Sequence, residues 1–309
     1  MFEESALEQG RNFNNKIWNA LKLVKMWSLR QGQFTVGSGQ SAERNFAVDW
    51  FANRLNEVRL EVDSMMNQFR LSEALKTIYS LIWDDFCSWY LEWVKPGFEQ
   101  PIDAAVYEKT VDFFEQLMQL LHPFMPFVSE EIYHLLRERS EDLCIKITGT
   151  AAQPDQTLLA EGEMLKQVIS AIRDARNRNQ VKPKETVKLH IQTNNAAAYT
   201  SIENLLSRQV NAESIAYTNE AIPDTVVVAV EKDKFYLNTG KVLDAGTLRA
   251  DLLKDLEHQK GFLASVEKKL GNERFVQNAK PEVLAIEQKK KSDALARIQT
   301  IEESLSTLR

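Results

Sequence analysis

Cysteine is scarce in this sequence of 309 residues, which contains only Cys87 and Cys144. Two distant thiols exclude the dense disulfide framework of small secreted proteins and the paired cysteine ligands of a structural zinc site. The four histidines, at positions 122, 134, 190 and 258, are scattered and show no ligand pairing on a helix. We therefore predict no metal site from the sequence.

Long apolar runs are also absent, because no stretch approaches the roughly 18 residues that a membrane span requires. The first residues, MFEESALEQGRN, are acidic and lack the apolar centre of a secretory signal peptide. The composition, 44% hydrophobic and 27% charged, is typical of a soluble globular protein. These features predict a cytoplasmic protein with no membrane partner.

Catalytic motifs are missing as well. The string GSG at 37–39 is not followed by Lys and Ser or Thr, and it lacks the spacing of dinucleotide-binding glycines. No nucleophile elbow and no convincing Cys–His pairing is present. The sequence predicts no catalytic residue and no cofactor in this chain, which favours a binding or scaffolding role.

Charge is distributed unevenly, although the formal net charge is only -6. From residue 246 onward there are twelve Lys and Arg against ten Asp and Glu, whereas the preceding residues have 26 against 34. This asymmetry weakly indicates that the C-terminal part binds an anionic partner.

Apolar residues recur at helical spacing through residues 1–140. They predict helices around 7–24 and 46–58, and a third from Leu71 to Val94 that Ser72 caps. A fourth is expected over Pro101–Leu121 and a fifth from near Ser129. Long helices with short connections predict a helical-bundle domain over 1–140. The repeating positions of the first helix are Leu7, Phe13, Ile17, Leu21 and Val24.

Residues 141–245 change character, since short β-branched runs alternate with helical stretches at 161–179 and 195–208. They predict a small α+β domain with an antiparallel sheet.

Residues 246–309 carry two apolar stripes, and Gly271 and Pro281 predict a turn between two antiparallel helices of a coiled coil. The fold class is mainly α. The predicted strands are Ile145–Thr148, Val187–Gln192, Ser214–Thr218, Thr225–Val230 and Lys234–Leu237.

Polar and basic side chains gather in three places. Each place has two open interpretations: a solvated or structural surface, or a contact with nucleic acid, in which Arg and Lys bind phosphates and Asn reads adenine. Phe275, at the turn of the final hairpin, either packs beneath it or stacks on bases. The candidates are Arg11, Asn15 and Lys22 in the first helix; Arg173, Arg176, Lys182 and Lys184 in the middle; and Lys268, Lys269, Arg274, Lys280, Lys289, Lys290 and Lys291 at the end.

A family resemblance is carried first by GRNFNNKIWNALKLVKMW at 10–27, FCSWYLEWVKP at 86–96 and LHPFMPFVSEEIY at 121–133. These strings resemble the anticodon-binding helical domain of class I aminoacyl-tRNA synthetases of the valine, isoleucine and leucine group. IRDARNRNQVKPKETVKL at 172–189 is similar to the connector of the valine enzymes. FLASVEKKLGNERFVQNAKPEVLAIEQKKKSDAL at 262–295 resembles the coiled-coil arm of bacterial valyl-tRNA synthetases, which the other two enzymes lack.

The resemblance implies a C-terminal tRNA-binding part that recognises the anticodon of valine tRNA and tethers the tRNA body. The family's HIGH and KMSKS signatures are absent, so ATP and magnesium would be used by a catalytic domain missing from this chain. The family's editing domain is missing as well. The resemblance also implies that Leu91 and Glu92 contact the anticodon. Glu can accept a hydrogen bond from the amino group of cytosine. No DNA partner is expected. Two alternatives stay open: a freestanding tRNA-binding module, and a structural protein that dimerises through its coiled coil.

Overall fold

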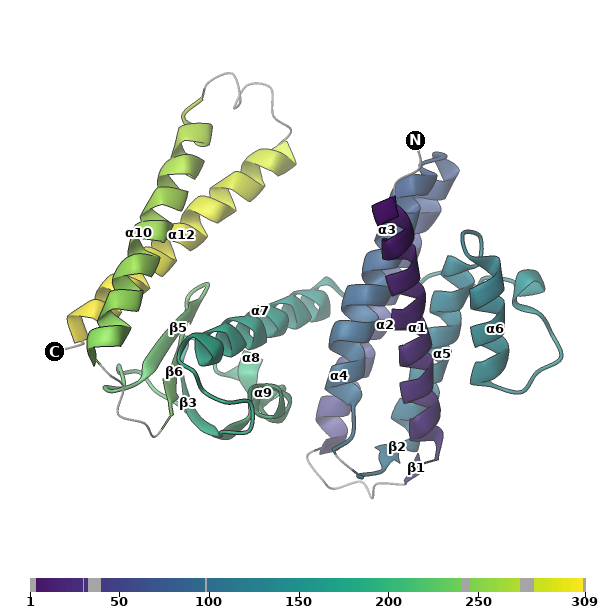
Figure 1. Ribbon diagram of the computed structural model, residues 1–309, viewed down its shortest axis with the longest axis horizontal. Helices are drawn as coiled ribbons and strands as arrows, with labels where there is room; N and C mark the ends of the chain where they lie inside the picture. Colours follow the sequence, from purple (N-terminus) through teal and green to yellow (C-terminus); the bar gives the residue numbers. More distant parts are fainter. Residues whose placement is uncertain are drawn as a thin grey trace. The chain divides into compact units, whose positions relative to one another are not determined.

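The computed structural model describes residues 4–29, 31–32, 40–97, 99–239, 245–272 and 281–307. The chain divides into two compact units, Met1–Met164 and Leu165–Arg309. Helices dominate both units, and the second also contains a four-stranded sheet (Figure 1). The predicted fold class, mainly α with an α+β portion, is confirmed. The predicted division into 1–140, 141–245 and 246–309 stays a prediction.

The first unit is a bundle of long helices. Its α3, η1 and α4 follow one another without a break and fill the predicted third helix from Leu71 to Val94. A short 3-10 helix, η2, comes after the last long helix, and two short strands, β1 and β2, pair in parallel. The bounds are α1 Glu4–Ser28, β1 Gln31–Gly32, α2 Gln40–Asn67, α3 Leu71–Ser80, η1 Leu81–Tyr90, α4 Leu91–Val94, β2 Ile102–Asp103, α5 Ala104–Leu121, α6 Pro126–Leu136 and η2 Leu143–Ile145.

Aromatic side chains fill the centre of the bundle. Phe51 packs against Phe86, with ring centroids 5.3 Å apart, and against Tyr90 at 4.9 Å. The hydroxyl of Tyr90 lies 2.7 Å from that of Thr110, so the buried phenol has a hydrogen-bond partner. The apolar stripe predicted for the first helix is buried from Phe13 to Val24, but Leu7 is 56% exposed and lies outside the core.

Three predicted details of the bundle are wrong. Ser72 does not cap the third helix, because Arg70 holds the cap position without a side-chain hydrogen bond. The fourth helix begins at Ala104, where the Asp103 carboxylate accepts hydrogen bonds from two backbone N–H groups, and not at Pro101. The fifth begins at Pro126, whose missing N–H suits the first helical turn, so Ser129 lies inside the helix.

The segment η1 is a π-helix, in which each N–H reaches a carbonyl five residues back. The backbone N–H of Leu91 shows this register, because it donates to the carbonyl of Phe86. The Ser88 hydroxyl also donates to the Trp83 carbonyl, at 2.9 Å. Such a turn changes the helical phase, and immediately after it Leu91, Trp93 and Val94 are buried while Glu92 is exposed.

Helix α7 (Gln156–Arg178) belongs to the first unit at its start and to the second for most of its length. The sheet of the second unit has the order β4-β3-β6-β5. Strands β3 and β4 are parallel, whereas β6 is antiparallel to both β3 and β5. The elements are β3 Val187–Gln192, α8 Ala197–Thr200, α9 Glu203–Val210, β4 Ala212–Tyr217, β5 Val226–Val230 and β6 Asp233–Asn238.

The predicted antiparallel sheet is therefore mixed. α8 and α9 form the crossover that makes β3 and β4 parallel, as a helical connection between neighbouring strands does. Strands β5 and β6 form a hairpin, because Val230 pairs with Asp233 across the turn between them. The predicted strand Ile145–Thr148 does not form, because Ile145 ends η2 and the exposed residues after it have no regular structure.

The chain ends in two long helices, α10 (Ala245–Leu270) and α12 (Pro281–Thr307), which we call the arm. Ion pairs at both ends of their contact show that they are antiparallel: Lys260 with Glu302, and Lys291 with Glu267. The side chains of Val266, Ala294 and Ile298 are buried between them. α12 also packs on β5 of the sheet. The predicted helical hairpin is confirmed, although Leu252 and Leu308 of its predicted stripes are not among the described side chains.

Candidate nucleic-acid interface

The exposed face of α1 carries the first group of predicted residues. Arg11, Asn15 and Lys22 are all exposed, and their spacing of four and seven places them on one side of the helix. Arg11 lies 3.5 Å from Glu8, with side chains 71% and 66% exposed. An ion pair so exposed contributes little, about 0–1 kcal/mol, so Arg11 can exchange Glu8 for another anion.

An aromatic stack lies where α1 meets the third helix. The rings of Tyr79 and Trp83 stack with centroids 5.6 Å apart, and Phe13 stacks on Tyr79 at 4.6 Å. The ammonium of Lys16 lies over Trp83, 5.0 Å from the ring centroid. Tyr79 and Trp83 are half-buried, so ring surface and a cation reach solvent together. Tyr79 and Trp83 were not predicted as site residues from the sequence, although their spacing of four along one helix was an available signal.

The side chain of Glu92 is 47% exposed and lies 3.4 Å from Lys95. Its exposure is consistent with the predicted contact with a base, which no observation yet tests. The predicted anticodon contact of Leu91 is corrected, because its side chain is only 2% exposed and packs inside the bundle. Trp93 is fully buried, with its ring centroid 4.7 Å from that of Trp50, so this tryptophan belongs to the core of the bundle.

The basic group at the end of α7 is partly structural. Arg176 is 6% exposed and donates hydrogen bonds to the carbonyls of Lys182, at 3.0 Å, and Glu185, at 2.6 Å. Burial lowers the pKa of its guanidinium. Arg176 therefore holds the turn that follows α7, and its assignment as a possible tRNA contact is wrong.

The other predicted residues of this region are exposed. Arg173 donates to the carbonyl of Gln209 at 3.1 Å and to its side-chain oxygen at 2.8 Å, which ties α7 to α9. Lys182 and Lys184 lie on the exposed turn beyond the helix. The two lysines remain candidates for contact with the tRNA backbone.

The lysines of the arm are exposed or half-buried, and most of them pair with carboxylates. Lys290 lies 2.7 Å from Glu287, and this hydrogen bond holds the pKa of Glu287 below its usual value. Lys268 pairs with none of the described residues, while Arg274, Phe275 and Lys280 lie outside the described ranges. The remaining pairs are Lys269 with Glu287, Lys289 with Glu231 and Lys291 with Glu267.

These pairs do not remove the lysines from a role in binding. The paired lysine side chains are 41–62% exposed, and the distances between their charged atoms reach 3.9 Å. At such exposure a phosphate can replace the carboxylate at little cost in free energy.

Within the described ranges, no helix combines the length and apolar character of a membrane span.

Comparison with known proteins gives two family matches. Residues 49–191 match the anticodon-binding domain of tRNA ligase, and residues 244–309 match the valyl tRNA synthetase tRNA binding arm. Among curated relatives, the valine–tRNA ligase of Porphyromonas gingivalis is 41% identical over 310 residues, covering 100% of this chain and 34% of the relative. That of Parabacteroides distasonis is 39% identical over 309 residues, covering 99% and 34%. That of Enterococcus faecalis is 30% identical over 318 residues, covering 100% and 36%.

The first match defines the class, since the chain contains an anticodon-binding domain of the tRNA ligases. The second match and the relatives define the family: the chain belongs to the valyl-tRNA synthetases and corresponds to their C-terminal part. The resemblance found in the sequence is thus confirmed. The chain spans about a third of the length of the curated relatives that it matches.

Proposed function

We propose that this chain is the tRNA-binding part of a cytoplasmic valine–tRNA ligase. The bundle recognises the anticodon of valine tRNA, and the arm tethers the tRNA body. The observation that carries this proposal is the occurrence, in one chain, of an anticodon-binding domain followed by an arm of the valyl family. Joining valine to tRNA with ATP and magnesium then falls to a catalytic domain outside this sequence, which an editing domain accompanies.

The chemistry of the exposed surfaces supports a division of labour. The bundle offers an exposed amide, an exposed carboxylate and a half-buried aromatic stack, and such groups read splayed bases by hydrogen bonding and stacking. On the arm, exposed lysines supply positive charge, which attracts phosphates without distinguishing one base sequence from another. Binding a tRNA in this way speeds aminoacylation by placing its acceptor end in a catalytic site elsewhere in the enzyme.

The arm argues against the structural alternative, in which the chain dimerises through a coiled coil. Val266 is 2% exposed and Ala294 is 3% exposed within a single chain, because α10 and α12 cover each other. The apolar seam is therefore already occupied. Light scattering with and without tRNA separates the two cases, since a dimer indifferent to tRNA supports only the alternative.

A panel of tRNAs tests the proposal. Gel shifts with purified valine, isoleucine and leucine tRNAs, at one salt concentration, should show the valine tRNA bound most tightly. The arm supplies affinity for tRNA in general, so the other two tRNAs should bind more weakly but measurably. Binding of none of the three would contradict the proposal.

A further inference from the structure

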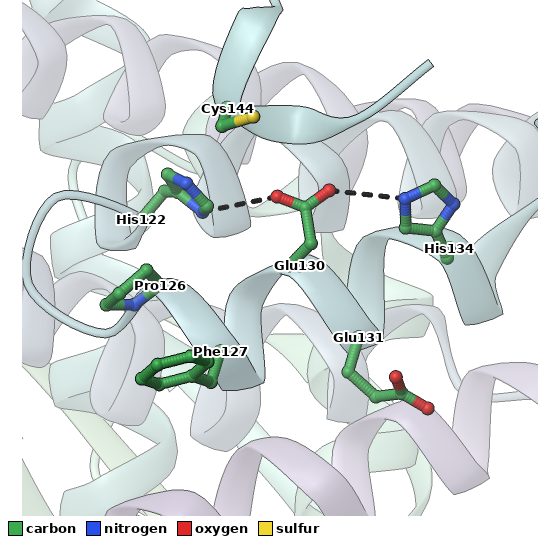
Figure 2. A pocket seen from close by; sticks show the side chains of 7 residues that line it. All are labelled: His122, Pro126, Phe127, Glu130, Glu131, His134 and Cys144. Atoms are coloured by element: carbon green, nitrogen blue, oxygen red, sulfur yellow. Dashed lines mark ion pairs between the residues drawn. The ribbon is translucent and has the colours of Figure 1, made fainter. Parts of the chain in front are cut away.

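Glu130, His134 and Asp142 form a cluster of two carboxylates and an imidazole on the bundle, and Figure 2 shows the first two of them. Glu130 and His134 are one turn apart on α6, and Asp142 stands just before η2. Nε2 of His134 is 3.2 Å from Oε1 of Glu130 and 3.2 Å from Oδ1 of Asp142. The three potential ligand atoms all lie within 4.8 Å of one another.

This arrangement is unusual for hydrogen bonding alone. One ring nitrogen carries at most one proton, and that proton cannot point squarely at two carboxylate oxygens. A zinc ion with ligands at 2.0–2.2 Å in tetrahedral geometry separates neighbouring ligand atoms by roughly 3.4 Å. The spacing around His134 therefore also suits three ligands of one ion.

The charges around Glu130 and Asp142 also favour a bound cation. Within the described part of the chain, neither Glu130 nor Asp142 forms an ion pair with a lysine or arginine; the partners seen are histidines. Two carboxylates facing a common point repel each other unless a proton or a cation lies between them. A divalent cation would satisfy both carboxylates.

The surroundings also resemble those of a metal site. The backbone N–H of Leu143 donates to Oε1 of Glu130 at 2.6 Å, and such hydrogen bonds orient ligating carboxylates. Figure 2 shows Glu130 between the rings of His122 and His134, in an open pocket of about 380 Å³ that Cys144 also lines. Nδ1 of His122 lies 2.9 Å from the Ser129 hydroxyl, which positions its ring beside the cluster.

We infer that Glu130, His134 and Asp142 bind one divalent metal ion, and zinc fits the set because imidazole and carboxylate groups are both among its usual ligands. The ion would fix the segment before η2 onto α6, since Asp142 comes from that segment and the other ligands from the helix. Sequence analysis predicted no metal site because only the fold brings Asp142 to the helix.

Isothermal titration calorimetry with zinc chloride tests this inference, on chelator-treated protein without an affinity tag. One zinc ion per chain should bind. His134→Gln and Asp142→Asn should each weaken binding by at least about tenfold, as changes around metal ligands do. His258→Gln is the matched control, because it removes an exposed histidine of the arm and should leave binding unchanged.

Two results would overturn the inference. One is the absence of saturable binding to the wild-type chain. The other is binding that survives in both His134→Gln and Asp142→Asn but disappears in Cys144→Ser, because the exposed thiol would then be the ligand. Asp142, whose side chain is 63% exposed, keeps the test valid if His134→Gln fails to fold.

Discussion

Nζ of Lys291, on α12, lies 2.9 Å from Oε1 of Glu267, on α10. Both side chains are substantially exposed, at 41% and 47%, so the pair faces water across the contact of the two helices. A lysine that the account assigns to tRNA phosphates is thus held by the arm's own carboxylate. At this pair, binding of a phosphate exchanges one anion for another.

The exchange predicts opposite effects for the two partners of this pair. Lys291→Gln should weaken binding to all tRNAs alike and reduce the slope of log affinity against log salt by about 0.7–0.9, the value of one phosphate contact. Glu267→Gln should strengthen binding, because the phosphate no longer competes with a carboxylate. Lys76→Gln, an exposed lysine of α3, serves as the control. An unchanged slope in Lys291→Gln would remove this lysine from the interface.

Glu92 is expected to contribute to recognition of the anticodon. Glu92→Gln should weaken binding of a valine anticodon stem-loop by about tenfold, because a good contact with a base edge contributes roughly 1–3 kcal/mol. Fluorescence anisotropy at matched salt measures the change. Glu61→Gln, an exposed glutamate of α2, should have no effect. Equal affinities of Glu92→Gln and the wild type would exclude Glu92 from the site.

Gly162, on α7, has no room for a larger residue. A Cβ there would overlap the indole ring of Trp50, which is 2% exposed. Gly162→Ala should lower the free energy of unfolding of the bundle by about 1–3 kcal/mol, the usual cost of overpacking. Gly10→Ala has open space within 4 Å and should raise it by roughly 0.5–1 kcal/mol.

Urea unfolding followed by tryptophan fluorescence measures both glycine variants. All six tryptophans lie before residue 94, so the signal reports on the first unit alone. A Gly162→Ala variant as stable as the wild type would show that α7 does not pack on Trp50.

Because of the Glu115 carboxylate, the free energy of unfolding of the bundle should depend on pH. It is buried and accepts hydrogen bonds from Arg137 at 2.9 Å and Arg139 at 2.5 Å. Burial alone would raise the pKa of Glu115, but the hydrogen bond and charge of Arg139, with the charges of Arg137 and Lys146, hold it below its ordinary value of 4.5. The unfolded state then binds the proton more readily.

The stability that Glu115 contributes is therefore complete above about pH 5 and is lost as the pH falls below 4.5 towards the pKa of the folded state. Glu115→Gln should lower the free energy of unfolding by about 1–3 kcal/mol at pH 7, since it removes the buried carboxylate that Arg137, Arg139 and Lys146 share. The difference from the wild type should shrink between pH 5 and pH 3. A difference independent of pH would contradict this assignment.

Local patterns in the sequence predicted much of the fold. The apolar spacing from Leu71 to Val94 and the proline at 281 placed helices where the structure has them, because both act within a few residues. The strand Val187–Gln192 was predicted with its observed bounds. Pairing of β3 with β4 depends on a crossover between distant segments, so its parallel direction could not be read from local pattern.

The candidate site was less predictable, because exposure and pairing depend on helical phase and on partners far away. Leu91 came from a resemblance, whereas its apolar side chain faces the core once the π-helix has set the phase. The pairing of Lys291 with Glu267 requires the register of the antiparallel arm. The spacing of Glu130 and His134 was visible in the sequence, but Asp142 joins them only in the folded chain.

The central claim is that this chain distinguishes valine tRNA by its anticodon. Competition binding tests it most directly, with valine tRNA set against the same tRNA carrying an isoleucine anticodon, at one salt concentration. The account predicts a preference of at least about tenfold for the valine anticodon, the discrimination expected from one or two good contacts with base edges. Equal affinities for the two tRNAs would contradict it.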